Sequence, residues 1–149
     1  MNLGKWAEYG WVKAEPTSRE EVKGLLTIVE RDLKDATIQG LSDDRRFEAA
    51  FNAARTCANL ALRASGYRTS TQTRHHVKKI ESLELTIGAD PKLIRRMKTL
   101  SQKRNATSYD TAGNVSTQEL ELGIKTGREL RDAVLSWLRK VHPELLDEK

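Results

Sequence analysis

The sequence predicts an all-α protein, an up-and-down bundle of four to five helices. Three observations support this prediction. Apolar residues recur at steps of three and four along most of the 149-residue chain. Residues that can cap a helix precede several of these segments, and no strand-like alternation of any length occurs. The connections between the segments are short, which favours antiparallel neighbours in one helical layer around a common core.

The first element is an N-terminal arm rather than a helix of the bundle. Residues 1–15 carry three aromatic side chains with no clear period, Trp6, Tyr9 and Trp11. We expect this arm to pack on the body or on a neighbouring subunit. Residues 16–149 are then expected to form a single helical-bundle domain.

The next two helices have clear start and stop signals. The first should span roughly residues 18–37, because Ser18 and Glu21 form a capping box ahead of an amphipathic run. The second should begin after a cap at Ser42 and stop at Gly66. Its many alanines imply close packing and a central position in the bundle.

Three further helices complete the prediction. One is expected at roughly 71–87, and another begins after a cap at Asp90 and runs towards Arg104. The last has a capping box at Ser116 and ends before Pro143. It also carries two glycines, four residues apart on its apolar face, that permit close packing: Gly123 and Gly127.

Charge is unevenly distributed along the chain. Its formal net charge is +5, yet the stretch from Gly66 to Tyr109 holds ten Lys and Arg against three Asp and Glu. A positive field of this kind attracts phosphate groups, although a solvated basic helix face is the alternative. The basic residues expected to contact nucleic acid are Lys78, Lys79, Arg95, Arg96, Lys98 and Lys103.

Other features exclude several classes of protein. The single Cys57 leaves no disulfide framework. No apolar run is long enough to cross a bilayer, and the N-terminal sequence MNLGKWAEYGW lacks the order of a signal peptide, so we expect a cytoplasmic protein. Neither a glycine-rich phosphate loop nor zinc-ligand spacing occurs, so we expect no cofactor and no metal ion.

The stretch LSQKRNATSYD, residues 100–110, raises the question of a site. Leu93, Met97 and Leu100 form an apolar stripe, and Arg104 is its next member. Helical geometry therefore predicts that this guanidinium faces inward, where it needs an anion or carbonyl partners. One alternative is an arginine bonded to helix-end carbonyls, and another is one that reaches solvent along its aliphatic stem.

Three segments carry a resemblance to a known family: FEAAFNAARTCANLALRASGYR, KRNATSYD and ELRDAVLSWLRKVHPELL. In order and spacing they resemble HEPN-domain proteins, which include prokaryotic RNase toxins and substrate-binding partners of minimal nucleotidyltransferases. The resemblance implies a HEPN-like bundle that forms a homodimer, with the arginine motifs of two subunits facing one cleft. It also implies metal-independent RNA cleavage and a partner such as an antitoxin or a nucleotidyltransferase.

The chain departs from the HEPN motif at one position. Arg104 and Asn105 match its first half, but Tyr109 stands where the motif has a histidine. A phenol with a pKa of about 10 is a poor general base at neutral pH. His75 or His76 is a candidate replacement, although ordinary surface or packing roles suit both. Two hypotheses follow. In the first, a dimer cleft binds RNA or a nucleotide, with or without cleaving the RNA. In the second, the protein is a non-catalytic interaction module.

Overall fold

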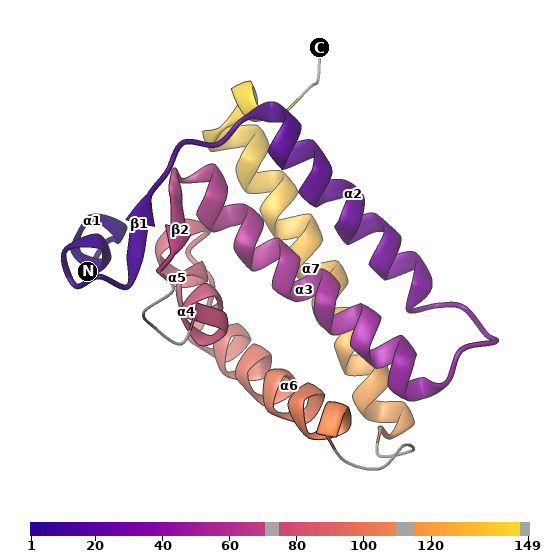
Figure 1. Ribbon diagram of the computed structural model, residues 1–149. Coiled ribbons are helices and arrows are strands. Elements are labelled where there is room, and N and C mark those ends of the chain that lie inside the picture. Colours follow the sequence, from indigo (N-terminus) through magenta and orange to yellow (C-terminus); the bar gives the residue numbers. More distant parts are fainter. Residues whose placement is uncertain (71–74, 110–114, 147–149) are drawn as a thin grey trace.

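The computed structural model describes residues 1–70, 75–109 and 115–146, except the side chains of residue 75 and of residues 106–109. Within these residues the chain is mostly helical, as the periodicity predicts (Figure 1). No helix in the described ranges is long and apolar enough to span a membrane. The expected loop TAGNV and Asp110 fall mainly or wholly outside the described residues.

Three long helices pack side by side to form the main body. These are α2 (Arg19–Asp35), α3 (Asp43–Ala64) and α7 (Thr117–Val141). Each begins after a serine whose hydroxyl accepts a hydrogen bond from the backbone N–H three residues on: Ser18, Ser42 and Ser116. The predicted boundaries of these helices are confirmed to within two residues, because local capping determines them.

Only one of the two predicted capping boxes is complete. At α7 the side chain of Glu119 accepts a hydrogen bond from the backbone N–H of Ser116, at 2.9 Å. At α2 the carboxylate of Glu21 instead accepts hydrogen bonds from Thr17 and from Arg63 of α3, the latter at 3.0 Å. Thr17 and a tertiary partner, Arg63, therefore take the place of the Ser18 backbone N–H.

The prediction of one helix over residues 71–87 is wrong. The region contains α4 (His75–Glu81) and α5 (Leu83–Thr86), and the described segment ahead of it is a short strand, β2 (Tyr67–Thr69). Between the two helices, the buried hydroxyl of Ser82 donates to the carbonyl of Lys79 at 2.7 Å. Such a bond back to the preceding turn competes with regular helix geometry.

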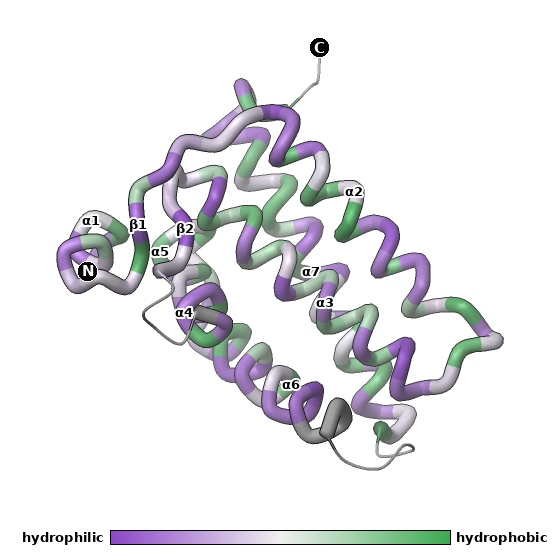
Figure 2. The backbone as a smooth tube through the Cα atoms, in the orientation of Figure 1, coloured by the Kyte–Doolittle hydropathy of each residue, from purple (hydrophilic) through white to green (hydrophobic). Residues whose placement is uncertain are grey.

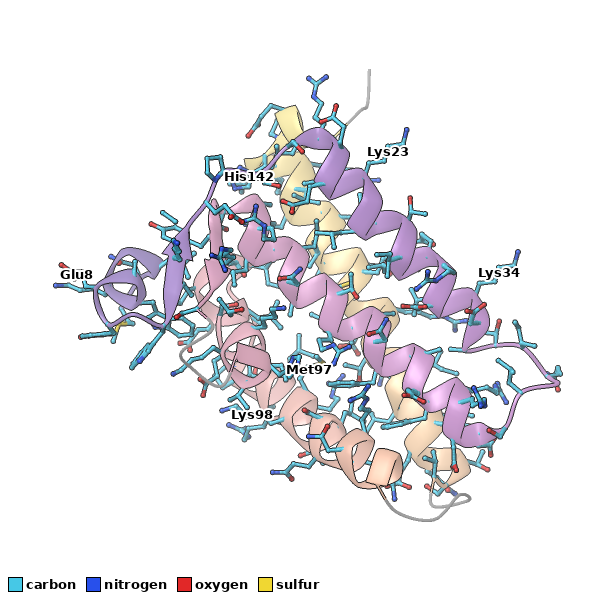
Figure 3. All side chains as sticks on the ribbon, in the orientation of Figure 1. Glu8, Lys23, Lys34, Met97, Lys98 and His142 are labelled. Atoms are coloured by element: carbon cyan, nitrogen blue, oxygen red, sulfur yellow. The ribbon has the colours of Figure 1, made fainter. Side chains whose placement is uncertain are left out.

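Helix α6 (Pro91–Tyr109) is longer than expected and runs on past Arg104. Figure 1 shows α3 between α2 and α6, so that α3 contributes to two interhelical seams. Met97 points from α6 toward α3, whereas Lys98 points away from the body (Figure 3). The face of α6 that carries Met97 therefore packs toward the interior.

The N-terminal arm is ordered and packs on the body. It consists of α1 (Leu3–Glu8) and β1 (Val12–Ala14), and β1 pairs antiparallel with β2 so that Val12 lies opposite Thr69. The ladder is absent from the prediction because strands of three residues are too short to show an alternating pattern.

Arg63 joins the arm to the bundle. Its side chain is buried and donates hydrogen bonds to the carbonyls of Glu15, Pro16 and Tyr67 at 3.0–3.1 Å. It also lies 2.9 Å from the carboxylate of Glu21, which satisfies its charge. A buried guanidinium with this many partners is a structural clamp.

The core lies between α2, α3 and α7 and continues under α4, α5 and α6. Figure 2 shows hydrophobic and hydrophilic residues alternating around these helices, as a period of 3.6 residues requires. The predicted close approach at the two glycines of α7 is confirmed. A Cβ on Gly123 would lie 3.2 Å from the ring of Phe47, and one on Gly127 would lie 3.0 Å from Leu33 and 3.2 Å from the carbonyl oxygen of Ala50.

Candidate functional site

A polar stripe runs along α3 between the seams with α2 and α6. Glu48, Asn52, Arg55 and Asn59 follow one another at steps of four, three and four, so they share one face of the helix. The last three are half-buried and Glu48 is exposed. Polar side chains are seldom buried without partners, so this stripe implies polar partners on the neighbouring helices.

Arg104 reaches this stripe from α6. Its side chain is 30% exposed, and its Nη2 lies 3.7 Å from Oε1 of Glu48 on α3. The guanidinium thus lies on the α3 side of α6, the direction that its spacing from Met97 and Leu100 predicts. It is half-buried at the surface of the bundle rather than enclosed in the core.

Arg55 lies in the stripe beside Arg104. Its Nη2 donates a 2.7 Å hydrogen bond to the amide oxygen of Asn52, whose nitrogen donates to the buried carboxylate of Asp32. Asp32 is also paired with Arg31 at 3.2 Å. Among the described residues, no carboxylate lies within ion-pair distance of Arg55, so its only hydrogen-bond partner there is a neutral amide.

The electrostatics reflect this shortage of counter-charge. Burial lowers the pKa of the Arg55 guanidinium, and the positive charge of Arg104 lowers the same pKa further. Asp32 and Glu48 act in the opposite direction but do not restore the ordinary value. A lowered pKa means that this environment disfavours the charged form of the side chain.

Lys79 of α4 adds a third cation. Its side chain is half-buried, and within the described part of the chain it has no ion pair. Burial lowers the pKa of Lys79, and the charge of Arg55 lowers it further. Arg55 therefore interacts with both Lys79 and Arg104. We call these three residues, contributed by α3, α4 and α6, the cationic cluster.

A shallow pocket of about 340 Å³ opens beside the cluster, between α2, α3 and α6. Arg104 and Asn52 line it together with Arg45, Asp32 and Glu48, so its wall carries both signs of charge. The cationic cluster is thus bordered by carboxylates on the α2 side. Such a border leaves the positive charge concentrated toward α4.

Two of the predicted nucleic-acid contacts lie on another face of α6. Arg96 forms an ion pair with Glu129 at 3.1 Å, and Lys103 forms one with Glu119 at 3.4 Å. Both acids belong to α7, so these cations bridge two helices. Their charge is largely balanced, which weakens their attraction for phosphate.

The remaining predicted basic residues are spread around α4 and α6. Lys78 and Lys98 share the carboxylate of Glu81, at 3.3 and 2.8 Å. Burial alone would raise the pKa of Glu81, but hydrogen bonds from the two lysines outweigh it and lower that pKa. Arg95 is exposed on α6. Of the six predicted basic residues, the structure therefore places Lys79 in the cationic cluster, and the other five lie elsewhere on α4 and α6.

The acid–base half of the expected motif falls largely outside the described side chains. Tyr109 is the last residue of α6, and His75 is the first of α4, but neither side chain is described. Asn105 and His76 are exposed. Asn105 follows Arg104 directly, so its side chain is turned about 100° around the helix axis from that of Arg104.

Cys57 has no part in this site. It is buried, and burial raises the pKa of its thiol to about 12, so the thiol remains protonated and unreactive at neutral pH. Among the residues that the structure describes, no group of three or more His, Cys, Asp or Glu could hold a metal ion.

Arg55 and Asn52 are functional candidates that the sequence prediction missed. The signal was available, because polar residues at steps of three and four interrupt an alanine-rich helix. Their importance depends on tertiary neighbours, which the pattern alone does not give. No protein-family model, curated protein or solved structure matches the chain.

Proposed function

We propose that this chain is a HEPN-like protein that binds RNA or a nucleotide by its phosphate groups, at the cationic cluster of Arg55, Lys79 and Arg104. One observation supports the proposal most strongly. Two half-buried cations, Arg55 and Lys79, have no ion pair within the described residues; burial and a nearby positive charge lower the pKa of each, Arg104 acting on Arg55 and Arg55 on Lys79. A bound anion would relieve that strain.

Phosphate suits this cluster better than a single carboxylate does. Each guanidinium offers several N–H donors in a planar fork, and the ammonium of Lys79 adds three rotatable donors. A phosphate group, or two successive groups of a chain, presents enough oxygens for all three. Binding would release counterions, so affinity should fall steeply with salt.

A homodimer would enlarge the site. The HEPN resemblance implies that two arginine motifs face one cleft, and we propose that the polar stripe of α3 faces that cleft. The test is sedimentation velocity of the purified chain, with and without RNA. A strictly monomeric species in both conditions would remove the dimer from the proposal and leave phosphate binding to a single chain.

Cleavage of the bound RNA is a separate step. Arg104 can stabilise charge on a phosphate, but it does not transfer protons at neutral pH. The test is incubation of labelled RNA with the native chain and with Arg104→Ala, both in excess chelator. Metal-independent cleavage that disappears in the variant supports a ribonuclease, whereas cleavage that survives excludes Arg104 from the mechanism.

Binding itself is tested by fluorescence anisotropy of a labelled uridine oligonucleotide at low salt. We expect Arg55→Gln, Lys79→Gln and Arg104→Gln each to weaken binding by about tenfold, as the loss of one charge-assisted contact predicts. Arg128→Gln is the matched control, because Arg128 is an exposed arginine of α7 outside the cluster. Equal effects from all four variants would reduce the cluster to non-specific charge.

The second candidate is a non-catalytic interaction module that binds a partner protein such as an antitoxin or a nucleotidyltransferase. It is favoured by the tyrosine that replaces the motif histidine and by a groove of about 740 Å³ along α2, which Leu135 of α7 and the segment after α7 also line. Leu26, Leu135 and Leu145 line this groove. Here Leu26→Lys should abolish partner binding while Arg104→Gln leaves it unchanged.

A further inference from the structure

The turn after α1 gathers three aromatic rings. Tyr9 is the C-cap of α1, and Gly10 follows with a φ of +78°, a conformation that favours glycine. The N–H of Gly10 bonds to the carbonyl of Ala7, and that of Trp11 bonds to the carbonyl of Trp6 at 2.9 Å. This is the Schellman arrangement, and its usual hydrophobic contact is supplied by the two indoles.

The three rings form a group with one buried and one exposed side. Trp6 is buried against Val12 and Leu62, and Trp11 meets it edge-on at a centroid distance of 5.6 Å. Tyr9 lies 4.8 Å from Trp11, yet its side is open, with 54% of the residue exposed. Packing explains the position of Trp6 but not an exposed phenol held next to an indole. We call Tyr9 and Trp11 the aromatic platform.

Helix α4 connects this platform to the cationic cluster. The ammonium of Lys78 lies 3.7 Å from the centroid of the Trp11 ring, and the next residue, Lys79, belongs to the cluster. The β1–β2 ladder lies between α1 and α4 (Figure 1). Lys78 and Lys98 share the single carboxylate of Glu81, so these three side chains together carry one excess positive charge.

We propose that the aromatic platform, through the exposed ring of Tyr9 with Trp11 beside it, stacks a base of single-stranded RNA whose phosphates lie on the cationic cluster. This inference rests on the proposed function and specifies its substrate class. Single strands expose base faces that stack on aromatic side chains, whereas the bases of a duplex are already stacked on each other. Positively charged grooves lined by aromatic side chains are the usual arrangement for binding such strands.

The test compares two probes, a uridine octamer and inorganic tripolyphosphate, which carries the charge without the bases. Tyr9→Ala should bind the octamer about tenfold more weakly and tripolyphosphate as the native chain does. Tyr9→Phe is the matched control and should keep native affinity for both, since the ring remains. Tyr9 is exposed, so the fold should survive, which a thermal melt verifies.

The other possible results each contradict one or both of the proposals, base stacking and phosphate binding. Native affinity of Tyr9→Ala for the octamer, or equal weakening toward both probes, overturns base stacking and leaves phosphate binding intact. Failure of the native chain to bind either probe overturns both proposals. If Tyr9→Ala alters the sedimentation of the RNA-free chain, the platform is a protein interface and the stacking proposal fails.

Discussion

Lys79 and Arg55 illustrate a conflict between stability and binding at the level of single residues. Both side chains are half-buried and lack ion pairs among the described residues, and each positive charge is disfavoured by burial and by a neighbouring cation, Arg104 for Arg55 and Arg55 for Lys79. A group that destabilises the free protein yet remains charged at neutral pH is a good candidate for ligand binding. The same reasoning makes a prediction about stability that does not require the ligand.

Lys79→Met should raise the Tm of the free protein. The substitution removes a desolvated charge and keeps most of the aliphatic stem, and each kcal/mol gained is worth about 2–4 °C in a chain of this size. Differential scanning calorimetry without RNA is the measurement. Lys98→Met is the control, since that ammonium lies 2.8 Å from Glu81 and should not raise the Tm when removed. A lower Tm for Lys79→Met would show that Lys79 is structurally required.

Two carboxylates should make the fold sensitive to acid. A hydrogen bond from Thr17 lowers the pKa of Glu21, and the lysine hydrogen bonds described above lower that of Glu81, in each case against burial. A lowered folded pKa means that the unfolded state binds protons more readily. Their stabilisation is therefore fully present above the ordinary value of 4.5 and is lost as the pH falls through the folded pKa values.

The measurement is the Tm between neutral pH and pH 3, for the native chain and for Glu81→Gln. The variant should be less stable at neutral pH and should lose less stability on acidification, so that the two curves converge. Parallel curves would show that Glu81 contributes nothing to the acid sensitivity.

At the scale of elements, α3 and α7 approach closely because of glycine. Gly127→Ala should destabilise the fold by about 1–3 kcal/mol, since the new methyl would meet the backbone of α3, which cannot move aside easily. Gly24→Ala is the matched change in α2: nothing lies within 4 Å of its added Cβ, and we expect a gain of about 0.5–1 kcal/mol. Chemical denaturation measures both, and a stable Gly127→Ala would contradict the close packing.

Sequence information was sufficient for some elements and not for others. The limits of α2, α3 and α7 follow from serine caps and apolar periods, which are local signals. The β1–β2 ladder and the division between α4 and α5 depend on pairing and on the buried Ser82, which are tertiary. At the site, the direction of Arg104 follows from helical geometry. The roles of Arg55 and Lys79 do not, because they depend on which described side chains lie within ion-pair distance of each cation in three dimensions.

At the scale of the whole molecule, Arg63 connects the aromatic arm to the bundle. Arg63→Met should lower stability by about 2–4 kcal/mol, because three carbonyls and the carboxylates of Glu15 and Glu21 lose their partner. We also expect limited proteolysis of this variant to cleave residues 1–15 faster than the core. If proteolysis of the variant is uniform along the chain, the arm and the bundle unfold together and Arg63 does not specifically hold the arm on the bundle.

The most direct test of phosphate binding by the cationic cluster is the salt dependence of RNA affinity. Each phosphate neutralised on a single strand contributes about −0.7 to the slope of log K against log salt concentration. A variant combining Arg55→Gln, Lys79→Gln and Arg104→Gln should therefore have a slope about 2 units shallower than that of the native chain. A variant slope equal to the native one would show that RNA phosphates bind elsewhere.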